Sequence, residues 1–194
     1  MNPRVAFTRA ELESFRGATV PDLVGPGLTL LFVGINPGLW TAATQTHFNH
    51  PGNRFYPALY AAGLIDIVVD RGRAMTDAER QHLVDRGIGI TNLVARATAR
   101  AAELTRDELR AGSERLAAFV AGNRPRVVAV AGITAYRDAF ERPTASLGRQ
   151  DERLDGADLW VVPNPSGLNA HATVATLAAA YRAAGEAAGV SLLR

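Results

Sequence analysis

Short unbroken runs of apolar residues recur along the chain, and polar or glycine-rich segments separate them. The clearest runs are LTLLFVGI (28–35), GIGIT (87–91), RVVAVAG (126–132) and LWVVPNP (159–165). A strand with one solvent-exposed face alternates apolar and polar residues, whereas a strand that is buried on both faces is apolar throughout. These runs therefore predict buried strands, and the last of them continues into a loop.

Helix signals lie between these runs. Some segments begin with a Thr that is followed, three positions later, by a Glu, which is the pattern of a capping box. They predict helices that begin after Thr8, Thr76 and Thr105. Glycines 17, 87 and 122 mark the predicted ends of these helices, and further helices are expected over 54–65, 133–140 and 171–188.

Strands that alternate with helices predict an α/β fold with a largely parallel sheet and helices on both of its faces. In such sheets, ligands bind beyond the carboxyl ends of the strands. Asn36, the 91–98 loop and the 164–170 loop each follow a predicted strand. We therefore expect these three segments to meet at one edge of the sheet.

Composition narrows the functional classes. The hydrophobic content of 47% and charged content of 21% are typical of a soluble globular protein. No apolar run is long enough to cross a bilayer, and the N-terminal residues carry charges where a signal peptide is apolar. We therefore expect a cytoplasmic protein with no membrane partner.

The absence of two residue types excludes several chemistries. There is no cysteine, which rules out disulfides, thiolate nucleophiles and cysteine-bound metal clusters. There is also no lysine, so all 21 basic residues are arginine and no side-chain amine can form a Schiff base. The net charge of +2 is compatible with nucleic-acid binding without requiring it.

The common cofactor and nucleophile motifs are also missing. The chain has neither GxGxxG after its first strand nor GxxxxGK[ST], which argues against nucleotide cofactors. His47 and His50 lack a third ligand in a metal-binding pattern, and Ser166 lacks the GxSxG context of a serine nucleophile. No cofactor and no metal are therefore expected.

Two loops resist a purely structural explanation. GINPGLW (34–40) places Asn36 at the end of a buried strand, although a simple turn would also suit its glycines. VPNPSGLNAH (162–171) is stiffened by two prolines and presents Leu168 at its tip. An exposed Leu on a rigid loop suits a wedge that is pushed between base pairs.

Together with FNHPGNRFY (48–56) and GIGITNLVARAT (87–98), these loops resemble the mismatch-specific uracil/thymine DNA glycosylases. This family is the Mug/TDG branch of the uracil-DNA glycosylase superfamily, and the resemblance extends roughly from Pro21 to Tyr181. It implies a three-layer α/β sandwich with a central, mostly parallel sheet flanked by helices. It also implies a single DNA glycosylase domain over 1–194, with a short N-terminal helical extension over 1–24.

The resemblance assigns roles to individual residues. Asn36 takes the position of the catalytic Asn, which orients a water because an amide is no base at neutral pH. Phe48 takes the position of the aromatic that stacks on the extruded base. The backbone N–H groups of Ile35 and Phe48 are candidates for holding the pyrimidine 2-oxygen. The remaining base-contacting positions are His47, Asn92, Thr98 and Asn164.

DNA contacts are implied on the same basis. Gly34 and Gly38 would let the DNA backbone approach, Ser166 and Gly167 would donate to phosphate or to the orphaned base, and Leu168 would fill the vacated stack. The chain departs from the family at Ala170, where bacterial members have Arg, and at Ile133, where they have Lys. Both departures predict weaker opposite-base or phosphate contacts.

The sequence therefore predicts a monofunctional enzyme, a monomer by default, whose partner is double-stranded DNA with a U·G or related mismatch. It would flip uracil out of the duplex and hydrolyse its N-glycosidic bond, leaving an abasic site. Two alternatives remain: a module that binds damaged bases with little turnover, and a hydrolase of free nucleosides. A DNA binder loses affinity steeply with salt, which separates it from the latter.

Overall fold

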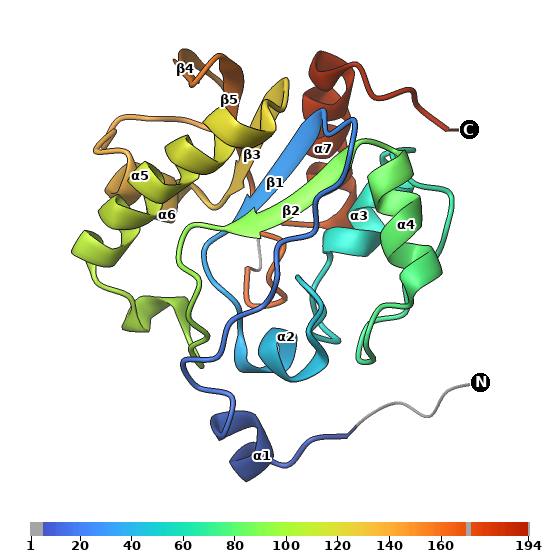
Figure 1. Ribbon diagram of the computed structural model, residues 1–194, viewed down its shortest axis with the longest axis vertical. Helices are drawn as coiled ribbons and strands as arrows, with labels where there is room; N and C mark the ends of the chain where they lie inside the picture. The colour runs from blue at the N-terminus through green and yellow to red at the C-terminus, as the bar shows by residue number, and fades with distance from the viewer. Residues whose placement is uncertain (1–5, 170–171, 194) are drawn as a thin grey trace.

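A five-stranded sheet forms the centre of the computed structural model, which describes residues 6–169 and 172–193 (Figure 1). Its strand order is β2-β1-β3-β5-β4. The parallel strands are β1 (Leu30–Gly34), β2 (Ile88–Asn92), β3 (Val127–Ala131) and β5 (Ala157–Val162). Only β4 (Gly148–Leu154) is antiparallel to its neighbour among the described strands. The predicted, mostly parallel sheet is confirmed.

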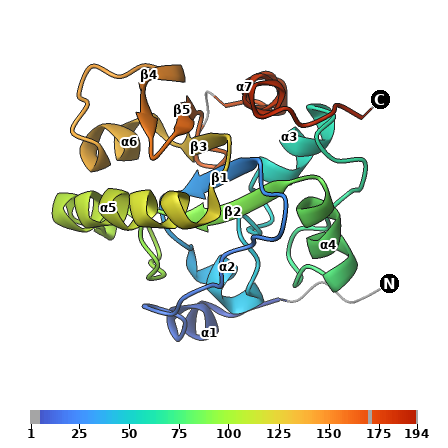
Figure 2. The ribbon, with the colours of Figure 1, turned by 45° about the horizontal axis from the view of Figure 1, so that its top comes forward.

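Helices cover both faces of the sheet, which makes the three layers visible in Figure 2. Helices α5 (Arg106–Asn123) and α6 (Ile133–Ala139) lie on one face. Helices α3 (Phe55–Ala61), α4 (Asp77–Asp85) and α7 (Val174–Ala188) lie on the other. This is the predicted three-layer α/β sandwich.

Strand β1 shows why its sequence is apolar throughout. Successive side chains of a strand point to opposite faces, so a sheet between two helical layers buries both sets. Leu31 and Val33 pack with α5 and α6, whereas Leu30 and Phe32 pack with α3 and α7. Because β1 lies between β2 and β3, the residues that follow it emerge within the carboxyl edge and not at its border.

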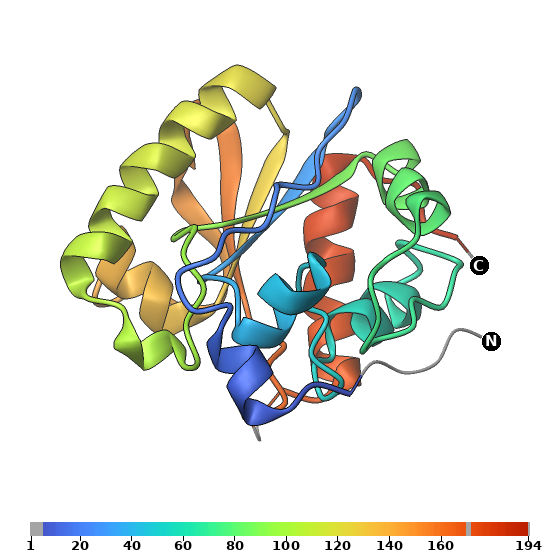
Figure 3. The same cartoon turned by 60° about the horizontal axis from the view of Figure 1, so that its bottom comes forward.

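The remaining helices lie at that edge, in front of the strand ends in Figure 3. They are α1 (Arg9–Glu13), α2 (Leu39–Thr44) and the 3₁₀ turn η1 (Ala101–Glu103). A small apolar cluster that includes Val20, Leu39 and Ala97 joins α2 to the N-terminal segment and the 93–98 loop. Leu23 then pairs with Ile90 through two backbone hydrogen bonds of 2.9 and 2.8 Å, so this segment lies along β2.

Capping boxes at Thr8, Thr76 and Thr105 are all confirmed. One predicted boundary is wrong: the helix expected over 54–65 covers only 55–61. The last strand ends at Val162 and continues into a loop as predicted, because Pro163 cannot continue the ladder. The last helix begins at Val174, capped by Thr173, and its predicted start at His171 lies outside the described residues.

Two elements were not anticipated. Strand β4 has the sequence GRQDERL, whose polar residues read as a loop, and α2 is a short helix that begins directly after Gly38. Within residues 6–169 and 172–193, no helix combines the length and the apolar character needed to cross a membrane.

Candidate functional site

The loops that follow β1 and β2 run side by side beyond the sheet. The N–H groups of Leu93, Val94 and Thr98 donate to the carbonyls of Gly34 (2.9 Å), Ile35 (2.9 Å) and Pro37 (3.1 Å). The two loops therefore continue the parallel pairing of their strands. This pairing makes the 34–38 segment a rigid support for Asn36.

The amide of Asn36 has one orientation that its neighbours dictate. Its Nδ2 donates to the carbonyl of Arg96 (3.0 Å) and to Oγ1 of Thr98 (2.8 Å). The Thr98 hydroxyl uses its proton to donate to the Arg100 carbonyl (2.9 Å), so toward Asn36 it can only accept. Both partners require the N–H groups, and Oδ1 of the half-buried Asn36 is left to accept a hydrogen bond from a ligand.

Phe48 forms a platform against Gly34, the last residue of β1. Its ring stacks on the fully buried Phe55, with centroids 4.2 Å apart and planes at 23°. Its backbone lies in the left-handed region at φ 54°, which is uncommon for a bulky residue. Phe48 is half-buried, so one ring face is packed while the ring keeps partial access to solvent.

Gly34 brings this platform against Asn92. A Cβ on Gly34 would lie 2.4 Å from Oδ1 of Asn92 and 3.1 Å from Cζ of Phe48. Gly34 is buried, so the expectation that DNA backbone approaches it is wrong: packing against these two side chains requires the glycine. Gly38 differs, because it is exposed and a Cβ there would meet no atom within 4 Å.

His47 lies behind Asn92 and is almost fully buried, with 4% of its surface exposed. Its Nε2 lies 2.9 Å from the Pro21 carbonyl, which can only accept, so Nε2 carries the proton. Its Nδ1 then accepts from Nδ2 of Asn92 at 3.1 Å. Burial lowers the pKa of His47, which keeps the ring neutral and suited to this arrangement.

The loop after β5, residues 163–169, completes the site and is called the wedge loop below. Asn164 Oδ1 accepts from the Ser166 N–H (2.9 Å), which closes a tight turn. The side chains of Asn164 and Ile35 both lie within 4 Å of the position that a Cβ on Gly132 would take. The β1 and β5 loops therefore meet at Gly132, as the sequence predicted.

Leu168 has 94% of its surface exposed at the tip of this loop, where its N–H donates to Oγ of Ser166 at 3.3 Å. Gly167 is exposed and Ser166 half-buried. Ala170, at which the sequence departs from the resembling family, lies outside the described residues. Ile133 is the first residue of α6, one position after Gly132.

The three sequence-predicted segments thus gather at one edge of the sheet. Comparison with known proteins shows the family to which the chain belongs. The family model described as the uracil DNA glycosylase superfamily matches residues 21–184. The chain belongs to the uracil DNA glycosylase superfamily. This membership makes it a DNA repair hydrolase that acts on glycosidic bonds.

A solved structure shows the same fold as this superfamily member. It is the solution NMR structure of a Methanosarcina acetivorans protein assigned provisionally as a uracil DNA glycosylase. The two chains are 17% identical, the match covers 87% of this chain and 96% of the other, and the TM-score is 0.56. At this identity the likeness supports the fold alone.

Sequence reasoning missed one residue that contacts the wedge loop, Arg54. It follows Asn53, whose Oδ1 accepts a hydrogen bond from the N–H of Phe55, the first residue of α3. The Arg54 guanidinium instead reaches the wedge loop and the residues just after it, where it donates to the carbonyls of Asn169 (3.0 Å) and Ala172 (2.9 Å). The only signal in the sequence was its place within FNHPGNRFY.

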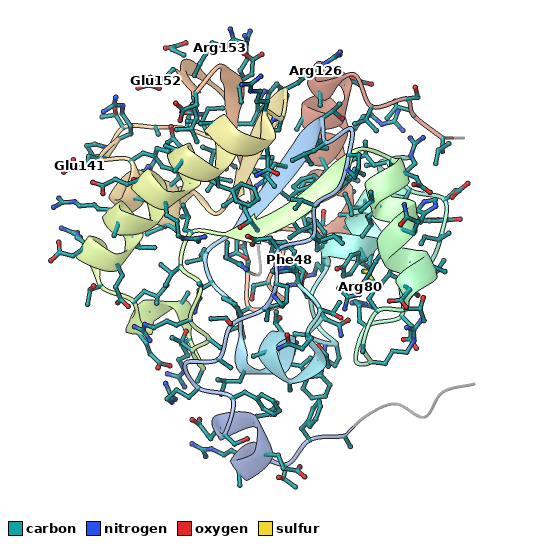
Figure 4. All side chains as sticks on the ribbon, in the orientation of Figure 1. Phe48, Arg80, Arg126, Glu141, Glu152 and Arg153 are labelled. Atoms are coloured by element: carbon teal, nitrogen blue, oxygen red, sulfur yellow. The ribbon has the colours of Figure 1, made fainter. Side chains whose placement is uncertain are left out.

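One sizeable hollow does not coincide with the gathered loops. It measures about 620 Å³ and lies at the opposite end of the sheet, before β3 and β5, where Arg126 and Arg153 line it (Figure 4). Phe48 lies well away from both arginines in the same view. We locate the candidate site at the gathered loops, since ligands of parallel sheets bind at the carboxyl edge. Among the described residues, no group of three His, Asp or Glu side chains could hold a metal.

Proposed function

We propose that this protein is a monofunctional uracil-DNA glycosylase of the mismatch-specific branch. It flips uracil out of a U·G mismatch in double-stranded DNA and hydrolyses the N-glycosidic bond, leaving an abasic site. The observation that carries the proposal is the fixed amide of Asn36, whose Oδ1 is left to accept from a ligand, two residues after the Gly34 that packs against the Phe48 ring.

Asn36 is proposed to position the attacking water. Cleavage of the glycosidic bond builds positive charge on the sugar while the electron pair of the bond leaves with the base. A water that donates one hydrogen bond to Oδ1 of Asn36 keeps its lone pair directed at the anomeric carbon. The amide does not remove the proton, so the rate gain comes from orientation alone.

Asn92 is proposed to read the base that stacks on Phe48. His47 occupies one hydrogen of Nδ2, which leaves the second hydrogen and Oδ1 for a ligand. Uracil offers a 4-oxygen and an N3–H, which match that donor and acceptor, whereas cytosine offers the opposite pattern. Stacking on an aromatic ring is worth about 1–3 kcal/mol per base and tolerates many rings, so the amide supplies the selectivity.

The other assigned residues surround this centre. The backbone N–H groups of Ile35 and Phe48 are proposed to hold the pyrimidine 2-oxygen, and Asn164 to donate to the leaving base. Thr98 is proposed to act through Asn36, because its Oγ1 accepts a hydrogen bond from Nδ2 of Asn36 and so orients the amide.

Gly38, Ser166 and Gly167 are proposed to contact the DNA backbone or the orphaned base. The exposed Leu168 would fill the space that uracil vacates, in the manner of apolar side chains inserted between base steps. Such an insertion offsets part of the cost of unstacking. Ile133 offers no charge to a phosphate, which favours modest affinity.

Asn36→Ala tests the proposal. In single-turnover reactions with a U·G duplex, we expect base release to slow by about 100-fold or more, since misplacing a reacting group costs about that much. Binding to the duplex should change little. Asn123→Ala is the matched control, because its side chain bonds only the Phe119 carbonyl of its own helix.

An Asn36→Ala enzyme as fast as the wild type would refute the catalytic role. If the wild type binds U·G duplex tightly but releases no uracil under single-turnover conditions, the protein is instead a damaged-base binding module. Both results are read from the same alkali-cleavage gel and a parallel binding titration.

A further inference from the structure

Arg54 connects two loops that come from distant parts of the chain. Its backbone N–H donates to the Pro165 carbonyl at 2.9 Å. Its Nη1 donates to the carbonyls of Asn169 (3.0 Å) and Ala172 (2.9 Å), with a longer contact to that of Ser166 (3.4 Å). The wedge loop and the start of the segment toward α7 thus curl around one guanidinium.

The side chain of Arg54 contacts backbone carbonyls, and no carboxylate of a described residue. Within the described part of the chain, no ion pair includes Arg54, although many of the other arginines have a carboxylate partner. The half-buried guanidinium is neutralised by carbonyl dipoles of the loop. A single nitrogen, Nη1, makes all three side-chain contacts, and the planar guanidinium fixes the directions of its N–H bonds, which a lysine ammonium on a flexible stem does not.

A second contact brings the same loops together without side chains. A Cβ on Gly167 would lie 2.7 Å from the carbonyl oxygen of Gly52. The two backbones are therefore in direct contact beside Leu168. A loop that is held at both its base and its tip has one shape, and Leu168 projects from that shape.

Arg54 also adjoins the base platform. Phe55, the next residue, is the ring on which Phe48 stacks. The element that supports the extruded base and the element that carries the wedge are thus joined through two consecutive residues. Motion of the wedge loop away from Arg54 would separate Leu168 from the platform.

We propose that Arg54 is a positioning residue that holds the wedge loop in the form that inserts Leu168 into DNA. The inference rests on the proposed function, because it assigns Leu168 the role of filling the vacated stack. Arg54 does not touch the reacting atoms. Its effect is confined to the step in which the base leaves the duplex.

The test compares two substrates for each variant. One is a duplex with uracil opposite guanine, and the other carries the same uracil in an unpaired bubble, where no stacked partner must be displaced. We expect Leu168→Ala and Arg54→Met to slow single-turnover release from the paired duplex by roughly tenfold or more. On the bubble, both should stay within about threefold of the wild type, because little unstacking is needed there.

Three further variants sharpen the comparison. Arg54→Lys keeps the charge but loses the fixed directions of the planar Nη1 group, so we expect a loss on the paired duplex close to that of Arg54→Met. It replaces that variant should Arg54→Met not fold. Arg71→Met is the matched control. Arg71 also donates to a backbone carbonyl, at 2.6 Å, but its partner is Asn53, the residue before Arg54. The double variant Arg54→Met/Leu168→Ala should be no slower than the slower single variant, because both changes remove one function.

Different results overturn different statements. Equal losses on both substrates, an unchanged rate on the paired duplex, or additive effects in the double variant would each overturn the role of Arg54. If Leu168→Ala shows no selective loss on the paired duplex, the wedge assignment fails and this inference fails with it. If the wild type releases uracil from neither substrate, the proposed function itself fails.

Discussion

At the scale of single residues, two amides define the candidate site, and acceptors around them fix which atom each presents. Asn36 points its N–H groups at Arg96 and Thr98, and Asn92 points one at His47. Asn36 and Asn92 could be predicted as site residues from the GINPG and ITNLV motifs. Their orientation could not, because the partners of Asn36 lie about 60 positions further along the chain.

Because the buried ring of His47 is neutral, we expect the free energy of unfolding to fall as the pH is lowered. Burial lowers its folded-state pKa below the ordinary 6.5, against the opposing effects of the Pro21 carbonyl and Asp22, while Arg80 lowers it further. Below pH 6.5 the unfolded chain binds a proton that the folded protein resists, so stability is present above that pH and falls as the pH drops. Base release should fall once the ring is protonated, since Nδ1 then no longer accepts from Asn92.

Urea unfolding between pH 7 and 5 measures this effect in the wild type and in His47→Gln. We expect the variant to be less stable at pH 7 but to lose less stability on acidification. If the free energy of unfolding falls equally with pH in both proteins, another group controls the loss of stability in acid.

At the scale of elements, α5 holds the loop that orients Asn36. Arg115 donates to the carbonyls of Asn92 and Leu93, the second at 2.9 Å. Glu108, which also completes the capping box of α5, pairs with Arg96 at 2.5 Å, and this hydrogen bond lowers the Glu108 pKa to about 2. The helix thus contacts the loop through two side chains, Glu108 and Arg115, about two turns apart.

Gly112 permits this close docking. A Cβ there would lie 2.5 Å from the Leu93 carbonyl oxygen, so Gly112→Ala should displace α5 from the loop. Alanine is favoured over glycine in a helix by about 1 kcal/mol, yet we expect net destabilisation by about 1–3 kcal/mol from overpacking, with slower base release. Thermal unfolding and single-turnover kinetics measure both.

Gly122→Ala is the control within the same helix. A Cβ at Gly122 would meet nothing within 4 Å, so this change should leave stability equal or slightly raised and activity unaffected. Gly112→Ala behaving like Gly122→Ala would mean that the backbone contact carries no energy.

Elements with strong local signals could be predicted from the sequence. The capping boxes and the apolar strands need no distant partner to be recognised. Strand β4 could not be, because its polar residues are tolerated only at the border of the sheet, beside β5. Helix α2 could not be predicted either, because Pro37 and Gly38, which directly precede it, indicate a turn.

At the scale of the whole molecule, parallel connectivity explains why distant motifs meet. Strands β1, β2 and β5 run in the same direction, so the loops after them share one edge, as the sequence predicted. The brace between Arg54 and the wedge loop could not be predicted, because it bridges positions 112 to 118 apart.

Composition at this scale also limits the chemistry after base release. An abasic sugar is trapped by borohydride when an enzyme amine forms a Schiff base with it, and this chain has no lysine. We expect no lysine-derived covalent adduct with a U·G duplex and no strand cleavage before alkali. A borohydride-stable adduct mapped to any side chain would contradict the monofunctional assignment.

The pairing of Leu23 with Ile90 has a consequence for solubility. Unpaired outer strands invite sheet addition between molecules, which leads to aggregation. Here the N-terminal segment occupies the free side of β2, and β4 on the opposite border exposes Arg149, Asp151, Glu152 and Arg153. Trimming the chain through Leu23 would remove the Pro21 carbonyl that holds His47, and it would also uncover a template on which copies of the protein could polymerise.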